Sequence, residues 1–473
     1  MGRTCQCFTW TLLLTVCILI GKISTQTDVC VRVPRKTTDC LLSHKYNPVP
    51  RDSVTASCLQ ELVWEYSAPQ NLSDFDKDYF KRLSGQFLQR PSVPLSGFRQ
   101  RHEYRQLSTL ERGKIHRAFQ ILYDEGTIHR YGKLYGQAYS TIRHSPAFLS
   151  FNRVFLTFFE EELRRVDDTI SLPYWDYTVD FQTDNPVNSL VWSDIFFGNG
   201  NGRLSIGDFR EWMSPKGPVQ RRYGESNYAQ LMSRETVAAI VSKCNSADVT
   251  YPVKNEADEA FVIEYHHNGA INWVGGSLSD ATTAAYDPVF YMLSACTDHI
   301  WEVYRHVQRA SCNKNPSMDY PAESDGISRG AFERMIGFSD LANALGYSNY
   351  WTSYWYNYTL ASACPDCKSE YLWCDRSINR CVGHSRRTDY NVGGYSAPLN
   401  EPFEPVADYV PHRVDLPAHP SPFNDGRTMA TAKRDAKLAV EKQIAAAAAA
   451  AAAANAAGER LMVLNALSQS SSD

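Results

Sequence analysis

Phenylalanine recurs at helical spacing within residues 147–166. Phe148, Phe151, Phe155 and Phe158 lie three or four residues apart, so their side chains fall on one face of an α-helix. Such a helix owes most of its stability to the packing of its apolar face. The pattern therefore predicts an amphipathic helix packed inside a domain, with Asn152 on or next to the inward stripe.

The segment from Glu264 to Trp301 contains two further helical stretches. It reads EYHHNGAINWVGG and, after a short polar insert, YDPVFYMLSACTDHIW. Four residues turn a helix by roughly 400°, so residues i and i+4 point in nearly the same direction. His267 and Ile271 have this relation, whereas His266 is turned from His267 by about 100° and should point elsewhere.

These motifs resemble the tyrosinase and haemocyanin (type-3 copper) family. HHN, WVGG and DPVF resemble its second copper-binding region, and HSPAFLSFNRVFLTFFEEELRRV at 144–166 resembles the first, with LPYWD between them. The resemblance covers roughly 93–381 and is closest in style to molluscan secreted tyrosinase-like proteins. It implies a mainly α fold, an antiparallel four-helix bundle inside a loop-rich shell with a cysteine-rich C-terminal extension.

In that family, each of two copper ions is held by three neutral imidazoles, and this chain keeps few of them. The resemblance places His144 and His267 at surviving metal-ligand positions, while Ala138, Asn152, Ile271 and Ser294 occupy the lost ones. Amide, hydroxyl and alkyl groups do not replace imidazole as copper ligands. We therefore expect no copper cofactor and name no catalytic residue.

Without copper, the two surviving histidines are interpreted as buried, hydrogen-bonded side chains. Asn152 would then be a polar group paired with His144 or with water, and Asn268 would cap or bond locally. His299 lies five residues past Ser294, about 140° away on a helix, so we expect it to point away from the site.

Two more histidines lie upstream, within a region of helical pattern. LSTLERGKIHRAFQILYDEG contains Ser108 and Glu111 at the spacing of an N-terminal capping box. His116 and His129 lie on or after this helix, and we interpret both as surface or half-buried residues.

The N-terminus has the layout of a secretory signal peptide. Residues 1–25 contain Arg3, an apolar run over 8–20 and then small polar residues. The run is shorter than the ~20 residues that a membrane span needs. We expect a secreted, extracellular chain without a membrane anchor.

Cysteine usage agrees with that compartment. Of 13 cysteines, three lie in the signal peptide, and the remaining even number predicts complete pairing in disulfides. A zinc site is the alternative for the CxxC cluster, but its context resembles the cysteine-rich tail of molluscan tyrosinases. The cluster comprises Cys364, Cys367, Cys374 and Cys381.

Composition excludes one class of partner. The net charge is −4 and the pI is near 6.3, without a basic run, so we expect no nucleic-acid binding. Sequons at Asn71 and Asn357 are candidate glycosylation sites.

The chain divides by composition into segments of different kinds. After the signal peptide we expect a cysteine-containing N-terminal region at 26–92, a tyrosinase-like domain at 93–310 and the cysteine-rich extension at 311–390. A proline-rich linker follows at 391–427 and an alanine-rich helical tail at 428–473, with an uninterrupted alanine run at 445–454. The tail is either a helix without a role or a self-association segment.

Two functions are compatible with these observations. The first is a secreted, non-catalytic tyrosinase-like protein with a structural or binding role in an extracellular matrix, such as the biomineralised matrix of mollusc shell. Its partners would be matrix components or other copies bound through the alanine-rich tail. The alternative is a copper-dependent phenol or catechol oxidase with an altered or partial copper site.

Overall fold

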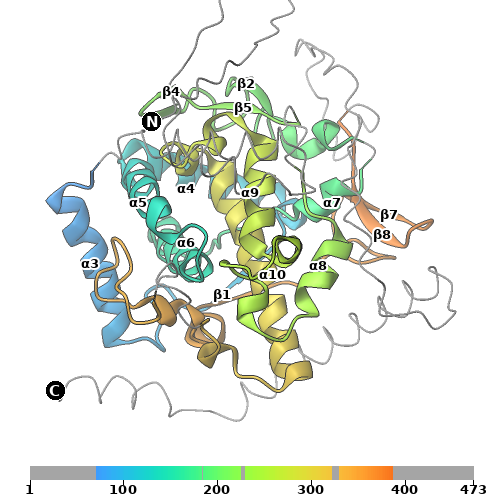
Figure 1. Cartoon of the computed structure of the whole chain (residues 1–473). Helices are drawn as coiled ribbons and strands as arrows, with labels where there is room; N and C mark the ends of the chain where they lie inside the picture. The colour runs from blue at the N-terminus through green and yellow to red at the C-terminus, as the bar shows by residue number, and fades with distance from the viewer. Residues whose placement is uncertain (1–70, 184, 225–229, 322–329, 387–473) are drawn as a thin grey trace, which may run out of the picture. The chain divides into compact units, whose positions relative to one another are not determined.

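The computed structural model describes residues 71–183, 185–224, 230–321 and 330–386 (Figure 1). Several predicted segments lie outside these residues: the signal peptide, most of the N-terminal region with Cys30, Cys40 and Cys58, the proline-rich linker and the alanine-rich tail. The fold below is that of the described residues alone.

The described chain is mainly helical, as predicted. Its α-helices are α3 (Asp74–Gln89), α4 (Thr109–Asp124), α5 (Thr127–Ile142), α6 (Ala147–Val166), α7 (Tyr177–Phe181), α8 (Arg234–Val241), α9 (Ile263–Val274) and α10 (Pro288–Cys312).

Short strands pair two by two between the helices. β1 (Arg99–Arg101) pairs in parallel with β6 (Tyr356–Tyr358), joining segments far apart in sequence. The antiparallel pairs are β2 (Asn201–Arg203) with β5 (Gln220–Arg222), β3 (Met213–Ser214) with β4 (Gly217–Pro218), and β7 (Leu372–Asp375) with β8 (Arg380–Gly383).

Helix α6 lies at the centre of the core. It packs against α4, α5 and α10, and α10 also packs against α9 (Figure 1). Phe155 of α6 contacts Tyr135 of α5 and Phe290 of α10 through their rings. The predicted apolar stripe is confirmed, but α6 is buried around nearly its whole circumference, including most of its charged residues.

Local signals define where the helices begin. Ser108 and Glu111 form the predicted capping box at α4. Asp287 caps α10 by accepting the backbone N–H of Val289 at 3.0 Å, and its carboxylate also takes two hydrogen bonds of 2.7 Å from Arg221. The DPVF motif thus anchors the start of α10 to strand β5.

Helix α3 falls within the predicted N-terminal region but belongs to the core. Phe80 packs edge to face against Tyr131 of α5, and Phe87 stacks on Trp351 with ring centroids 4.3 Å apart. The core thus includes residues upstream of 93, the start expected for the tyrosinase-like domain.

A buried ionic cluster joins α6, α10 and the β1–β6 pair. Arg101 pairs with Glu160 at 2.8 Å, and Arg153 pairs with Asp298 at 2.7 Å and with Glu302 at 2.8 Å. Burial by itself raises the pKa of Glu160, but the neighbouring arginines Arg101 and Arg99 lower it to about 2. We refer to Arg101, Arg153, Glu160, Asp298 and Glu302 as the ionic cluster.

Disulfides account for most of the described cysteines. Cys244 pairs with Cys312, and the CxxC cluster forms Cys364–Cys374 and Cys367–Cys381. The prediction of disulfides rather than zinc in this cluster is therefore confirmed.

Complete pairing of the cysteines is wrong, because Cys296 is a buried free thiol. It lies in α10, 1% exposed, and burial raises its pKa well above the ordinary value. An even cysteine count thus does not exclude a thiol that packs as a small apolar side chain.

The structure also bears on the two glycosylation sequons and on the question of a membrane span. Asn71 and Asn357 are both exposed, which leaves their glycosylation a prediction. None of the described helices combines the length and apolar character that a membrane span requires.

Candidate functional site

The structure buries most of the residues at the family's ligand positions. They lie on the core helices α5, α6, α9 and α10, and none is more than 8% exposed: Ala138, Asn152, His267, Ile271 and Ser294. These five positions, which the resemblance identified, therefore belong to the bundle interior.

His267 is a core histidine, 1% exposed, as interpreted from the sequence. Its Nδ1 lies 3.0 Å from Thr297 Oγ1 on α10, and its ring packs edge to face against Phe148 of α6. Burial lowers the pKa of His267 to about 3, so the imidazole is neutral at physiological pH. Its Nε2 has no hydrogen-bond partner among the described residues.

Asn152 and Ser294 approach the same region from α6 and α10. Asn152 Nδ2 donates to the carbonyl of Phe148 at 2.8 Å, a bond within its own helix rather than the expected bond to His144. Thr297, the partner of His267, bonds the carbonyl of Leu293 beside Ser294. We call Asn152, His267 and Ser294 the bundle centre.

Each residue of the bundle centre carries a buried polar atom without a partner among the described residues. These atoms are Asn152 Oδ1, His267 Nε2 and Ser294 Oγ. Buried polar atoms usually have a partner, so three orphans together mark an unusual part of the core.

His144 does not join the bundle centre. It is exposed, lies in the turn before α6 with φ of 53°, and packs its ring against Tyr251. The interpretation of His144 as a buried histidine is therefore wrong. The family pattern has one more residue between this histidine and the following proline. The turn in this chain is therefore shorter, and it leaves the imidazole of His144 at the surface.

Glu264 is the residue of this region that sequence reasoning missed. Its buried carboxylate accepts the backbone N–H of His144, with both oxygens within 3.0 Å. Burial raises the pKa of Glu264 to about 8, against hydrogen bonds from the backbone of His144 and Ser145 and from the Asn268 side chain. The local bonding expected for Asn268 is confirmed, and the i, i+4 spacing of Glu264 and Asn268 was the available signal.

The other histidines point to other partners. His266 Nε2 lies 2.8 Å from the carbonyl of Ala260, and His299 lies between the rings of Tyr174 and Tyr358. Both therefore point away from the bundle centre, as the helical rotation predicted.

His129 is half-buried, as interpreted, but His116 is not a surface residue. His116 is 3% exposed and bonds Tyr104 and Asp208 through its two ring nitrogens. Neither histidine replaces a missing ligand.

The described residues do not fit a copper ion. Only one group of three metal-capable side chains gathers in the described chain, namely Cys364, Cys367 and Cys381, and all three sulfurs are in disulfides. The ligand positions on the core helices supply one imidazole, an amide, a hydroxyl and alkyl groups, which is not a ligand set for copper in either oxidation state.

Comparisons with known proteins bear on the family. Residues 113–307 match the family described as the common central domain of tyrosinase. A putative tyrosinase-like protein (tyr-3) of Caenorhabditis elegans is 32% identical over 296 residues, covering 59% of this chain and 42% of that protein. Tyrosinase-like protein 2 of Margaritifera margaritifera is 31% identical, covering 50% of this chain and 55% of that protein.

Two further comparisons concern longer matches and solved structures. Tyrosinase-like protein 1 of Margaritifera margaritifera is 25% identical over 85% of this chain and 86% of its own length. A polyphenol oxidase structure from Thermothelomyces thermophila is similar over 69% of this chain and 98% of its own, with 16% identity and a TM-score of 0.46.

The chain thus spans about half the length of the first two relatives. The matched segment contains helices α5, α6 and α9, α10 up to residue 307, and the bundle centre. Over residues 113–307 the chain is thus similar to the common central domain of tyrosinase.

Proposed function

We propose that this chain is a secreted tyrosinase-fold protein that works without copper, as a structural or binding component of an extracellular matrix. The observation that carries the proposal is the bundle centre. Asn152, Ile271 and Ser294 fill positions where copper chemistry needs imidazoles, and His267 is held by Thr297 as a core side chain.

The disulfides support an extracellular location. Three are formed among the described residues, and disulfides persist in oxidising compartments and are rare in the cytosol. Similar proteins of Margaritifera margaritifera and Pinctada maxima are named tyrosinase-like. The proposed partners are matrix components, or further copies joined through the alanine-rich tail.

Catechol oxidation after copper loading tests the absence of catalysis. We expect the copper-incubated protein to oxidise a catechol no faster than the protein-free copper control. A matched variant restores histidine at all four lost positions: Ala138→His, Asn152→His, Ile271→His and Ser294→His. We expect any gain in catechol oxidation to need all four changes together, and each single change to give none. Turnover by the unaltered protein would contradict the proposal and favour a copper oxidase with an altered site.

A further inference from the structure

Tyr104, His116 and Asp208 form a hydrogen-bonded chain that shares no residue with the bundle centre. The hydroxyl oxygen of Tyr104 lies 2.5 Å from His116 Nε2, and His116 Nδ1 lies 2.7 Å from Asp208 Oδ2. Tyr104 and His116 are 0% and 3% exposed, whereas 60% of the Asp208 side chain is exposed. The chain therefore runs from a buried phenol through a buried imidazole to a carboxylate at the surface. We call these three residues the relay.

The hydrogen bonds of the relay determine which nitrogen of His116 carries the proton. The hydrogen bond from His116 lowers the pKa of Asp208, so this carboxylate is ionised at physiological pH and can only accept. Burial lowers the pKa of His116, against the hydrogen bond and the charge of Asp208, so the imidazole is neutral with its proton on Nδ1. Nε2 is therefore the acceptor for the Tyr104 hydroxyl.

Burial keeps Tyr104 in its neutral form. Its ring packs against Phe196 and Phe197, with centroids 5.1 and 4.8 Å apart. Burial raises the pKa of Tyr104, because an apolar environment disfavours the phenolate. Tyr104 therefore does not ionise at physiological pH as long as it keeps all its electrons.

Loss of one electron changes this balance. A phenol that loses an electron becomes a strong acid, and its proton then moves to a base within hydrogen-bond reach. His116 Nε2 is such a base, and the imidazolium that forms stays paired with Asp208. The positive charge of Arg112 opposes protonation of His116, so the carboxylate of Asp208 is needed to offset it.

Aromatic rings connect the relay to the surface of the protein. Phe209 packs against His116 with centroids 4.8 Å apart and against Trp212 at 5.4 Å. Trp212 in turn stacks on Tyr123 at 4.4 Å. Tyr123 is half-buried, so an oxidant in solution can contact its ring without entering the core. The packed rings thus provide a path for an electron from Tyr104 to the surface.

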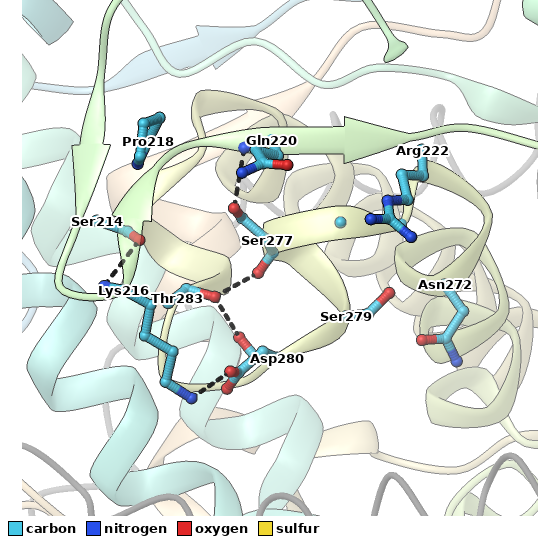
Figure 2. A pocket seen from close by; sticks show the side chains of 12 residues that line it. Ser214, Lys216, Pro218, Gln220, Arg222, Asn272, Ser277, Ser279, Asp280 and Thr283 are labelled. Carbon is cyan, nitrogen blue, oxygen red and sulfur yellow. Dashed lines mark hydrogen bonds and ion pairs between the residues drawn. The ribbon is translucent and has the colours of Figure 1, made fainter. Parts of the chain in front are cut away.

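The polar cavity shown in Figure 2 does not reach the relay. This cavity, of about 620 Å³, lies between the β3–β4 hairpin, strand β5 and the loop that follows α9. None of its described lining residues belongs to the relay. The cavity therefore brings no small molecule to Tyr104, and the chemistry that the relay supports is electron transfer through the rings.

We propose that Tyr104 is a one-electron redox site, with His116 as its proton acceptor and Asp208 as the positioning residue that stabilises the imidazolium. The oxidant is a phenoxyl radical at the protein surface, which takes one electron from Tyr104 and one proton from water and becomes a phenol. Tyr104 loses that electron, its phenolic proton moves to His116 Nε2, and a neutral tyrosyl radical remains. Return of one electron to Tyr104 and of the proton from His116 restores the starting state.

Pulse radiolysis of the full chain in azide solution tests the proposal, because the azide radical is a one-electron oxidant of tyrosine and tryptophan. The optical absorption of the phenoxyl radical is followed at two protein concentrations. Radicals at the surface decay by coupling between molecules, so their decay is faster at the higher concentration. A radical on buried Tyr104 cannot couple in this way. We therefore expect a long-lived component whose decay is independent of protein concentration.

Variants assign this component to the relay. Tyr104→Phe should abolish it, whereas Tyr135→Phe, at a buried tyrosine of α5, should leave it unchanged. His116→Gln keeps a hydrogen-bond acceptor but supplies no base, so the yield of the long-lived component should fall at least about tenfold. Asp208→Asn keeps the shape of the side chain and removes its charge, so the yield should fall severalfold.

An undiminished yield in Tyr104→Phe or in His116→Gln would overturn the proposal, and so would the absence of a long-lived component from the unaltered protein. Thermal midpoints check that the variants are folded. Asp208 is largely exposed, so Asp208→Asn is a test that does not disturb the core, and an unchanged yield in this variant would also contradict the proposal. None of these results depends on copper content, so a failure here is distinguishable from a failure of the proposed function.

Discussion

Helices α6 and α10 contribute residues to two polar regions, the bundle centre and the ionic cluster. Asn152 and Arg153 are adjacent on α6, and Ser294 and Asp298 are one turn apart on α10. At the bundle centre, Asn152 and Ser294 each leave an oxygen without a partner in the described chain. In the ionic cluster, Arg153 and Asp298 bond each other, and Asp298 also accepts Tyr356 and Tyr358 at 2.6 and 2.7 Å. The bundle centre thus leaves polar atoms without hydrogen-bond partners in the described chain, whereas the ionic cluster gives nearly every charged group several partners.

This difference distinguishes residues that stabilise the fold, in the ionic cluster, from residues at the copper-ligand positions of tyrosinases, in the bundle centre. Charges buried without compensation would cost several kcal/mol each, so the ionic cluster is tied to folding. Arg153 Nη1 lacks a hydrogen-bond partner among the described residues, but its guanidinium lies 4.1 Å from the centre of the Trp301 ring. The bundle centre holds only neutral groups, whose replacement the packed helices can tolerate.

The largest effect is expected from breaking the ionic cluster. Asp298→Asn removes the charge that compensates Arg153, and loss of one member of a buried pair costs about 3–5 kcal/mol. Denaturant unfolding should show this loss. A change below about 1 kcal/mol would mean that the cluster contributes little and that the contrast with the bundle centre is wrong.

A second effect is expected from Glu264, whose pKa in the folded state is raised from 4.5 to about 8. A raised pKa means that the folded state favours the protonated carboxyl, so this contribution to stability is complete below about pH 4.5 and is lost as the pH rises toward 8. We expect the free energy of unfolding of the unaltered protein to fall by roughly 2–4 kcal/mol relative to Glu264→Gln across that window.

Unfolding both proteins at a series of pH values between 5 and 9 measures the Glu264 effect, because other titrating groups cancel in the difference. A constant difference would show that the backbone N–H groups of His144 and Ser145 hold Glu264 ionised throughout.

A small effect is expected at the bundle centre. Ser294→Ala removes a hydroxyl whose oxygen has no partner in the described chain, so stability should change by less than about 1 kcal/mol, in either direction. It is a matched control for Asp298→Asn, one turn away on the same helix. A loss of about 2 kcal/mol or more would reveal a hydrogen bond of Ser294 that stabilises the core.

The smallest effect is expected for alkylation of Cys296, which lies between Ser294 and Asp298. Its alkylation measures how often this part of α10 becomes exposed to solvent. Since the thiol is buried and its pKa is raised, native protein should not be alkylated there, whereas unfolded, unreduced protein should be. Peptide mapping by mass spectrometry distinguishes Cys296 from Cys244 and Cys312. Alkylation of Cys296 in native protein would indicate that the core around the bundle centre opens.

Local sequence signals predicted the helical framework well. The phenylalanine spacing of α6, the capping box at Ser108 and the inward position of Asn152 all follow from helical periodicity or from motifs within one segment. The disulfides of the CxxC cluster followed from the expected compartment and from the resemblance to the cysteine-rich tail of molluscan tyrosinases, whereas the spacing alone also allowed zinc.

The ionic cluster and the position of His144 depend on contacts between distant segments. Glu160 lies in a run of three glutamates that looks solvent-facing, and its partner Arg101 comes from another segment. His144 is exposed because the turn is short and its backbone is held by Glu264, 120 residues away. Helical periodicity cannot supply such pairings.

The copper content of the purified, full-length protein tests the central claim most directly. We expect well under one copper per chain by elemental mass spectrometry, even after incubation with copper and removal of the excess, because no described group of three imidazoles gathers at the bundle centre. A stoichiometry near two coppers per chain, lost in His267→Ala, would contradict it and restore the copper oxidase as the function of this fold.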